Sequence, residues 1–161
     1  MTDRVTPAVR SQNMARIRGK YTTPERYIFA VATAGGLRFI KHAKGVFGRP
    51  DLVFPTKRVA VFVDGDFWHG FRFPQWSRRM AEFWQKKIAG NRERDRRNFR
   101  RLRQAGWKVV RLWEHQVEAD VLACVLRIAD AVDAVDFDAV RAGAILMRMP
   151  PLKRRRRLPR P

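Results

Sequence analysis

Carboxylate side chains are scarce in this chain, and a few of them stand where a metal-dependent reaction could use them. The chain has 35 Lys and Arg residues against 15 Asp and Glu residues, a formal net charge of +20, so each acid needs an explanation. Asp51 starts one apolar run, Asp64 ends the next, and Glu25 stands at an expected helix start. If the two runs pair as a hairpin, these carboxylates converge as the oxygen ligands that Mg²⁺ prefers. Alternatively, Asp51 caps a turn and Glu25 caps a helix together with Thr22.

An aromatic loop with a histidine, residues 65–77, follows Asp64 directly and begins with the segment GDFWHG. His69 could take a proton from water or steady a leaving group near a metal, or it could touch only phosphate or nothing. Phe67 and Trp68 could insert between base pairs or stack on single-stranded bases. The alternative is that these two rings only cap the hydrophobic core.

Basic charge is concentrated in two segments. Residues 78–111 hold 13 basic and three acidic side chains, and residues 148–161 hold seven basic side chains and no acid. An excess of this size favours a polyanion through counterion release, and Trp residues interleave with it, so we expect nucleic acid as the partner. A merely solubilising surface is the alternative. An anionic membrane is the weaker rival, because the basic segments lack a continuous apolar face.

Composition excludes several other classes of protein. No apolar run approaches the roughly 20 residues that span a bilayer, and the N-terminus lacks the apolar segment of a secretory signal. The single cysteine, Cys124, excludes an internal disulfide and a Cys-rich zinc module. It falls on an apolar helix stripe, so we expect a buried core thiol in a soluble, intracellular protein.

Local patterns predict the elements that must position these residues. Thr22-Thr23-Pro24-Glu25 starts a helix, because Thr can cap it, Pro is tolerated in the first turn and Glu favours the positive end. Gly35-Gly36 ends that helix. In the long helix that follows the aromatic loop, Arg92 and Asp95 interrupt the apolar stripe, and such a gap is either exposed or functional. The remaining expected elements are strands at 37–40, 51–54, 58–64 and 107–113 and helices at 78–104, 117–132 and 136–147.

This order of elements predicts an α/β fold, one mixed sheet with helices on its faces. We expect an N-terminal arm at residues 1–20, a folded domain at 21–147 and a disordered basic tail at 148–161.

Five segments together resemble the very-short-patch repair (Vsr) family of DNA mismatch endonucleases. They lie between Arg10 and Glu114 and read RSQNMARIRGKYTTPE, GRPDLVF, VFVDGDFWHG, FWQKKIAGNRERD and LRQAGWKVVRLWE. Each segment alone is a weak signal, but DGDFWHG followed by FWxxKIxxNxxRD is highly specific. The resemblance implies a restriction-endonuclease-like fold with a core of the PD-(D/E)xK type.

The resemblance also implies roles for individual residues. Asp51 would be the central Mg²⁺ ligand, joined by the backbone carbonyl of Val63 and, as a candidate ligand, by Asp64, at a position where some members have His and others Asp. His69 would act on the attacking water or the transition state, and Glu25 would orient solvent. Two further groups would meet the DNA, namely an aromatic wedge with a minor-groove residue and a helix along the duplex: Phe67, Trp68 and Trp84 with Met14, and Lys87, Asn91, Arg94 and Asp95.

Two features depart from the family pattern. Many members hold a structural zinc through Cys and His after the FWH segment and Cys after the last WE, where this chain has Asp66, Phe71 to Phe73 and His115. Only Asp66 and His115 could be ligands, so we expect no structural zinc and expect the loop from Phe71 to Trp76 to pack in its place. The Arg-rich tail would add non-specific DNA affinity and blur mismatch dependence.

The activity implied by the resemblance is Mg²⁺-dependent nicking of one strand 5′ of the mispaired T in a T:G pair, which starts repair of deaminated 5-methylcytosine. The expected partners are double-stranded DNA with that mismatch and, at the family level, mismatch-repair proteins. We expect a cytoplasmic, nucleoid-associated monomer without membrane contact. Two alternatives stay open: a nickase or nuclease of the same fold with relaxed or different specificity, in a defence or mobile-element setting, and a non-catalytic DNA-binding protein.

Overall fold

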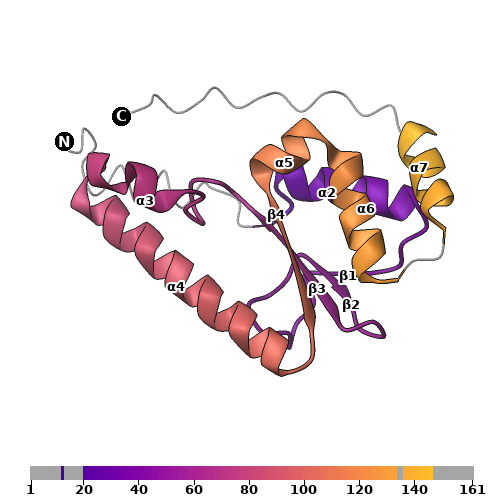
Figure 1. The fold of residues 1–161 in the computed structure, drawn as a ribbon, viewed down its shortest axis with the longest axis horizontal. Coiled ribbons are helices and arrows are strands. Elements are labelled where there is room, and N and C mark those ends of the chain that lie inside the picture. The colour runs from indigo at the N-terminus through magenta and orange to yellow at the C-terminus, as the bar shows by residue number, and fades with distance from the viewer. Residues whose placement is uncertain (1–11, 13–19, 134–135, 147–161) are drawn as a thin grey trace.

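A mixed β-sheet lies between two layers of helices (Figure 1). The computed structural model describes residue 12, residues 20–133 and residues 136–146. The four strands follow one another in the sheet in chain order: β1 (Ile40–Lys41), β2 (Leu52–Phe54), β3 (Val59–Asp64) and β4 (Lys108–Trp113). The first three are antiparallel neighbours, and β3 and β4 are parallel. The predicted α/β class with a mixed sheet is therefore confirmed.

The predicted hairpin of β2 and β3 sets which residues meet at one end of the sheet. Leu52 pairs with Val61, and Phe54 pairs with Val59. The antiparallel register puts the beginning of β2 beside the end of β3. Asp51 and Asp64 consequently lie at the same end of the sheet.

The two faces of the sheet are covered by different helices (Figure 1). Side chains alternate along a strand, so Val59, Val61 and Val63 join a core cluster with residues of α2 (Thr23–Ala34) and α6 (Val121–Ala131). Ala60 and Phe62 point the other way and pack with residues of α4 (Glu82–Gln104). The same alternation places Asp64 on the α4 face.

The long helix begins later than its sequence pattern suggests. A 3₁₀ turn, η1 (Ser77–Arg79), precedes it, and Met80 is extended, with φ −104° and ψ 157°. A short helix, α3 (Phe73–Trp76), also occupies part of the expected aromatic loop. The prediction of a helix starting at residue 78 was therefore wrong by one turn.

Two other boundaries also differ from the expected ones. The strand expected at 37–40 has only its last residue in β1, because the N–H of Leu37 donates to the carbonyl of Ala32 and closes the end of α2 instead. The helix expected at 117–132 is divided at Asp120, whose carboxylate accepts a hydrogen bond from the N–H of Ala123 and caps a new helix. The resulting elements are α5 (Glu114–Ala119) and α6, and the expected short helix is α7 (Phe137–Leu146).

The remaining predictions on the chain have mixed outcomes. Cys124 is 3% exposed in the core, which confirms its assignment as a buried thiol. Within the part of the chain that the structure describes, no helix is both long and apolar enough to cross a membrane. Met14, the basic tail and most of the N-terminal arm lie outside the described residues.

Candidate active site

Glu25 lies in the first turn of α2 with its carboxyl group turned inward, and it is 3% exposed. Its Oε1 accepts a hydrogen bond from the Thr22 hydroxyl at 2.7 Å, and its Oε2 accepts one from the N–H of Tyr21 at 2.7 Å. The carboxylate therefore does stabilise the helix start, as the capping alternative suggested. A carboxylate oxygen has two lone pairs, so each oxygen can still bind a second group.

Asp51 reaches the same place from the beginning of β2. Its N–H donates to the Val61 carbonyl, and its Oδ2 accepts a hydrogen bond from the N–H of Val63 at 2.7 Å. Burial raises the pKa of Asp51 from 3.8 to about 8; the hydrogen bond from Val63 opposes this rise, and the charges of Glu25 and Asp64 add to it. A carboxyl group shifted in this way by burial and neighbouring acids is typical of a functional site.

His42 completes this group, which we call the Glu25–His42–Asp51 cluster. Its Nε2 lies 3.4 Å from Oε2 of Glu25, and its Nδ1 lies 3.5 Å from Oδ1 of Asp51. Burial lowers the pKa of His42; Glu25 opposes this, and Lys20 and Lys41 lower it further. The neutral imidazole has one nitrogen without a proton, and this is the form that binds a metal.

A second group of polar side chains, the Asp64–His69–Asp95 cluster, lies on the α4 face of the sheet. Nδ1 of His69 lies 2.6 Å from Oδ2 of Asp95, and Nε2 lies 3.4 Å from Oδ1 of Asp64. Asp95 is 6% exposed, so the polar gap in the apolar stripe of α4 is buried. A carboxylate that accepts a hydrogen bond from Nδ1 orients the ring and leaves Nε2 available.

Arg111 of β4 joins the two carboxylates of the second cluster. Its Nε donates to Oδ2 of Asp64 at 2.6 Å, and its Nη2 donates to Oδ2 of Asp95 at 3.2 Å. Burial raises the pKa of Asp64, although His69 and Arg111 act in the opposite direction. Burial alone would also raise the pKa of Asp95. The hydrogen bond from His69 and the charges of Arg94 and Arg111 outweigh it and hold that pKa below its ordinary value.

Both clusters bring three potential ligand atoms within 4.8 Å of one another, but they differ in what already binds their carboxylates. In the second cluster, Arg111 and Arg94 donate hydrogen bonds to the carboxylates. In the first cluster, the hydrogen bonds to the carboxylates come from neutral donors, and Nε2 of His42 is buried without a hydrogen-bond partner. A metal needs free lone pairs, so the Glu25–His42–Asp51 cluster fits a divalent ion better.

The sequence-predicted site residues are thus divided between two clusters. Glu25 and Asp51 lie in the first, and Asp64 and His69 lie in the second. The electrostatic interaction of Asp64 with Asp51 links the two, as expected for acids at the meeting ends of a hairpin. The structure pairs Asp64 with an arginine, and the expected role of the Val63 carbonyl as a ligand stays a prediction.

The expected wedge residues gather in an aromatic cluster beside the beginning of α4. The Phe67 ring stacks on Trp76, with centroids 6.1 Å apart and planes at 16°. It also meets Trp68 and Trp84 edge to face, with centroid distances of 5.1 and 5.5 Å. All four rings are half-buried. They support one another, and each keeps exposed surface on which a base could stack.

The expected DNA-contacting helix also braces the site loop. Nδ2 of Asn91 donates to the carbonyl of Trp68 at 2.9 Å, and Nη1 of Arg94 donates to Oδ1 of Asn91. Asp95, one turn further along, belongs to the second cluster. Lys87 is exposed on the same helix. The helix thereby fixes the aromatic loop and the histidine of the second cluster relative to each other.

The place expected to lack zinc is filled by side chains. Nδ1 of His115 lies 2.7 Å from Oδ1 of Asp66, and the Phe71 ring packs on His115 and Trp113 at centroid distances of 4.4 and 5.1 Å. Nε1 of Trp76 donates to the Phe71 carbonyl at 2.8 Å. The loop therefore packs here as expected, and the absence of a structural zinc stays a prediction.

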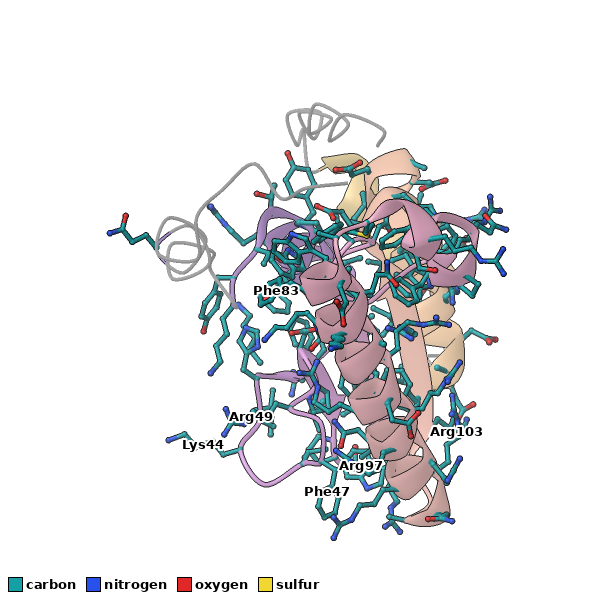
Figure 2. The ribbon with its side chains drawn as sticks, turned by 90° about the vertical axis from the view of Figure 1, so that its left-hand side faces the viewer. Lys44, Phe47, Arg49, Phe83, Arg97 and Arg103 are labelled. Carbon is teal, nitrogen blue, oxygen red and sulfur yellow. The ribbon has the colours of Figure 1, made fainter. Side chains whose placement is uncertain are left out.

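A basic face extends from the clusters along the second half of α4. Figure 2 shows Lys44, Phe47 and Arg49 on the loop before β2 and Arg97 on α4, on the face of the molecule that this view presents. These four side chains are exposed. The guanidinium carbon of Arg101 lies 3.5 Å from the centre of the Phe47 ring and holds this loop against the helix. The exposed cations form a surface suited to a phosphate backbone.

Two residues of the clusters were missed by the sequence reasoning. His42 follows a two-residue strand and precedes a loop with no motif, so nothing local indicates that its ring turns back toward Asp51. Arg111 carries a signal that was available: it is a charged residue within the otherwise apolar part of the strand WKVVRLW. On a strand, such a residue must face solvent or a buried acid.

Comparison with known proteins agrees with this geometry. The sequence profile of the family described as DNA mismatch endonuclease Vsr matches residues 2–75. The chain is 37% identical over 135 residues to the type II nicking enzyme V.XorIIP of Xanthomonas oryzae, covering 83% of this chain and 98% of that relative. It is 39% identical over 136 residues to V.NmeDIP of Neisseria meningitidis serogroup C, another type II nicking enzyme, covering 81% of this chain and 90% of that relative.

A further relative carries the family's own name. The chain is 38% identical over 119 residues to DNA mismatch endonuclease Vsr of Escherichia coli K12, covering 71% of this chain and 74% of that relative. The mixed sheet flanked by helices is consistent with a restriction-endonuclease-like core of this kind. This chain belongs to the DNA mismatch endonuclease Vsr family.

Proposed function

We propose that this chain nicks one strand of duplex DNA on the 5′ side of the mispaired T in a T:G pair, with Mg²⁺ as cofactor, and so starts repair of deaminated 5-methylcytosine. The observation that carries the proposal is the crowding of three carboxyl groups in a chain of net charge +20: Glu25 and Asp64, which are buried, and Asp51, which is half-buried. A protein that only bound DNA would gain nothing from acids at this place, because they repel phosphate. The names of the relatives, a mismatch endonuclease and nicking enzymes, support the same activity.

Glu25 and Asp51 would hold the divalent ion. When bound, such an ion neutralises phosphate charge and lowers the pKa of a coordinated water. Asp51 contributes a carboxylate whose Oδ2 is fixed by the N–H of Val63, so that Oδ1 stays available. Glu25 is held from both sides by the helix start and can orient solvent without moving.

His69 would move protons during the reaction. Because Asp95 binds Nδ1, Nε2 is the nitrogen that can take a proton from the attacking water or give one to the leaving oxygen. Arg111 holds both carboxylates that flank this ring and so fixes its orientation. Asp64 adds an acidic neighbour to Nε2 and connects this proton-transfer half of the site to Asp51.

Phe67, Trp68 and Trp84 would enter the duplex at the mismatch. Unstacking a base step costs a few kcal/mol and costs least where pairing is already defective. A T:G wobble pair is therefore opened more readily than a matched pair. Asn91 holds the backbone at Trp68 and keeps the wedge at a fixed distance from the cleavage site.

The basic face would follow the DNA beyond the site. Lys44 and Arg49 stand on the loop that leads into Asp51, so the phosphates on that side of the cut would pass over them and over Arg97 (Figure 2). These contacts would be independent of sequence, because they reach phosphates and not bases.

The experiment that tests the proposed function uses duplexes that differ only at one pair. Strands labelled at the 5′ end, with T:G, C:G or T:A at that position and varied neighbours, are incubated with the full chain in Mg²⁺ or in EDTA. We expect one nick, 5′ of the mispaired T, in T:G duplexes with Mg²⁺ only. Equal cutting of the matched duplexes would favour the nuclease of relaxed specificity. Tight binding without cutting in any context would favour the non-catalytic DNA-binding protein.

A second experiment tests the path over the basic face. Replacing Lys44 and Arg97 together by Ala is expected to reduce the slope of log binding constant against log salt by about 1–2, since each lost phosphate contact accounts for about 0.9. Arg141→Ala is the matched control, because Arg141 is exposed on α7 across the sheet from α4 (Figure 1). An unchanged slope in the double variant would contradict this path.

A further inference from the structure

His42 supplies the imidazole of the first cluster, and its surroundings fix the position of the ring. Its backbone N–H donates to the carbonyl of Asp51 at 3.0 Å, and its φ of 46° turns the chain so that the ring points inward. The side chain is 8% exposed. Tyr21 and Phe29 enclose the ring edge to face, at centroid distances of 4.8 and 5.7 Å. The ring is thus fixed between the two carboxylates of Glu25 and Asp51.

The distances around the ring are too long for hydrogen bonds to explain its position. Charge-assisted hydrogen bonds between nitrogen and oxygen are about 2.7–2.9 Å long, whereas the two ring nitrogens lie 3.4 Å from Glu25 and 3.5 Å from Asp51. Nε2 is buried and has no hydrogen-bond partner. A buried polar group without a partner is destabilising and requires an explanation.

A cation bound at Nε2 would account for the missing hydrogen-bond partner of this nitrogen and for its distance from Glu25. Two ligand atoms about 2.1 Å from one ion, at the angles of an octahedral or tetrahedral site, lie about 3.0–3.4 Å apart. The distance of 3.4 Å between Nε2 of His42 and Oε2 of Glu25 falls at the tetrahedral end of that range. In the second cluster, by contrast, Nδ1 of His69 already binds Asp95 at 2.6 Å. Nε2 of His69 is also free, but Arg111 and Arg94 donate hydrogen bonds to the carboxylates of the second cluster, so the first cluster fits an ion better.

We propose that His42, through Nε2, is a direct ligand of the divalent ion held by Glu25 and Asp51, so that this site favours Mn²⁺ over Mg²⁺. The inference rests on the metal site of the proposed function and specifies its ligand set. Mg²⁺ takes oxygen ligands and keeps several waters, whereas first-row divalent ions accept imidazole nitrogen more readily, and Mn²⁺ is the first of that series. A ligand set of two carboxylates and one imidazole therefore extends the range of metals that the site can use.

The test is pulsed electron paramagnetic resonance of Mn²⁺ bound to the full chain without DNA. A nitrogen ligand gives a ¹⁴N modulation that a site with only oxygen ligands lacks. We expect this modulation in the wild-type protein and in the His69→Gln variant, and its loss in His42→Gln. Its absence from the wild-type protein would overturn the inference whether or not any variant folds. Its loss in His69→Gln with retention in His42→Gln would assign the ion to the other cluster and overturn it as well.

Affinities give a second readout that separates a ligand from a merely structural residue. By titration calorimetry, we expect His42→Gln to weaken Mn²⁺ binding about 10-fold or more and to weaken Mg²⁺ binding much less. His115→Gln is the matched control, because His115 lies outside both clusters. Equal losses for both metals would indicate that His42 acts only by packing, against the proposal.

The outcomes for this inference and for the proposed function are distinguishable. A ¹⁴N signal that depends on His42, in a protein that does not nick T:G duplexes, would support the ligand assignment and contradict the activity. Nicking of T:G duplexes by a protein whose Mn²⁺ shows no nitrogen ligand would support the activity and contradict the ligand assignment.

Discussion

Replacement of Asp51 by Asn is expected to stabilise the metal-free protein at neutral and alkaline pH. Burial raises the pKa of Asp51 from 3.8 to about 8 in the folded chain, so the folded state holds a proton that the unfolded state has lost between these values. Where the folded state binds more protons, the free energy of unfolding falls as pH rises. The wild-type protein therefore loses stability from about pH 4 to pH 8, and the Asn variant lacks this loss.

The size of the effect follows from the pKa of the carboxyl group. A pKa shift of one unit corresponds to about 1.4 kcal/mol of stability. Between pH 5 and pH 9, the wild-type protein loses stability only up to the folded-state pKa of about 8, so the upper limit of the loss is about 4 kcal/mol. The Asp51 side chain keeps 16% exposure, and solvent reorganises around its charge. We accordingly expect the stability difference between Asp51→Asn and the wild-type protein to grow by about 2 kcal/mol between pH 5 and pH 9. The amide oxygen of Asn can keep the hydrogen bond from Val63, so packing should change little.

The assay is urea unfolding in EDTA at pH 5, 6, 7, 8 and 9, for the wild-type protein, Asp51→Asn and a matched control. Asp130→Asn is that control, because Asp130 is exposed on α6, away from both clusters. Excess Mg²⁺ at pH 8 should stabilise the wild-type protein and leave Asp51→Asn unchanged, since only the former keeps the ionisable ligand. A stability difference that does not change from pH 5 to pH 9 would show that burial does not raise the pKa of Asp51.

Three further predictions concern the second cluster and α4. Asp95→Asn should slow single-turnover nicking about 100-fold or more with unchanged DNA affinity, because His69 loses the carboxylate that orients it; a rate within threefold of wild type would contradict this. Gly70→Ala should lower the free energy of unfolding in urea by about 1–3 kcal/mol, because φ is +65° and the new Cβ would lie 2.8 Å from Cγ2 of Ile88. Gly90→Ala, in open space on α4, should raise the same quantity by about 1 kcal/mol, and a loss would show an unrecognised contact there.

Local sequence signals were sufficient for the elements that carry the site. Val59 to Asp64 is a β-rich run with a turn before it, and this pattern alone predicts the hairpin that brings Asp51 near Asp64. Thr22 to Glu25 predicts the start of α2 correctly, because capping chemistry is local. The division of the helix at Asp120 was missed, since an Asp that starts a new helix can also sit on the exposed face of a continuous one.

The composition of the two clusters was harder to predict, because it depends on contacts between distant parts of the chain. Nothing near His42 in the sequence shows that a positive φ turns its ring between Glu25 and Asp51. Asp95 was recognised as a gap in an apolar stripe, but its partner His69 lies 26 residues away, and only the packing of α4 on the sheet brings them together.

We propose that Asp51 serves cleavage and not DNA binding. The most direct test measures both properties on one T:G duplex, comparing wild-type protein with Asp51→Asn in Mg²⁺ under single-turnover conditions. We predict loss of the nick 5′ of the mispaired T in the variant, with DNA affinity equal to or higher than that of the wild-type protein, because a charge that repels phosphate is removed. Nicking by Asp51→Asn at the wild-type rate would show that cleavage does not need the Asp51 carboxylate.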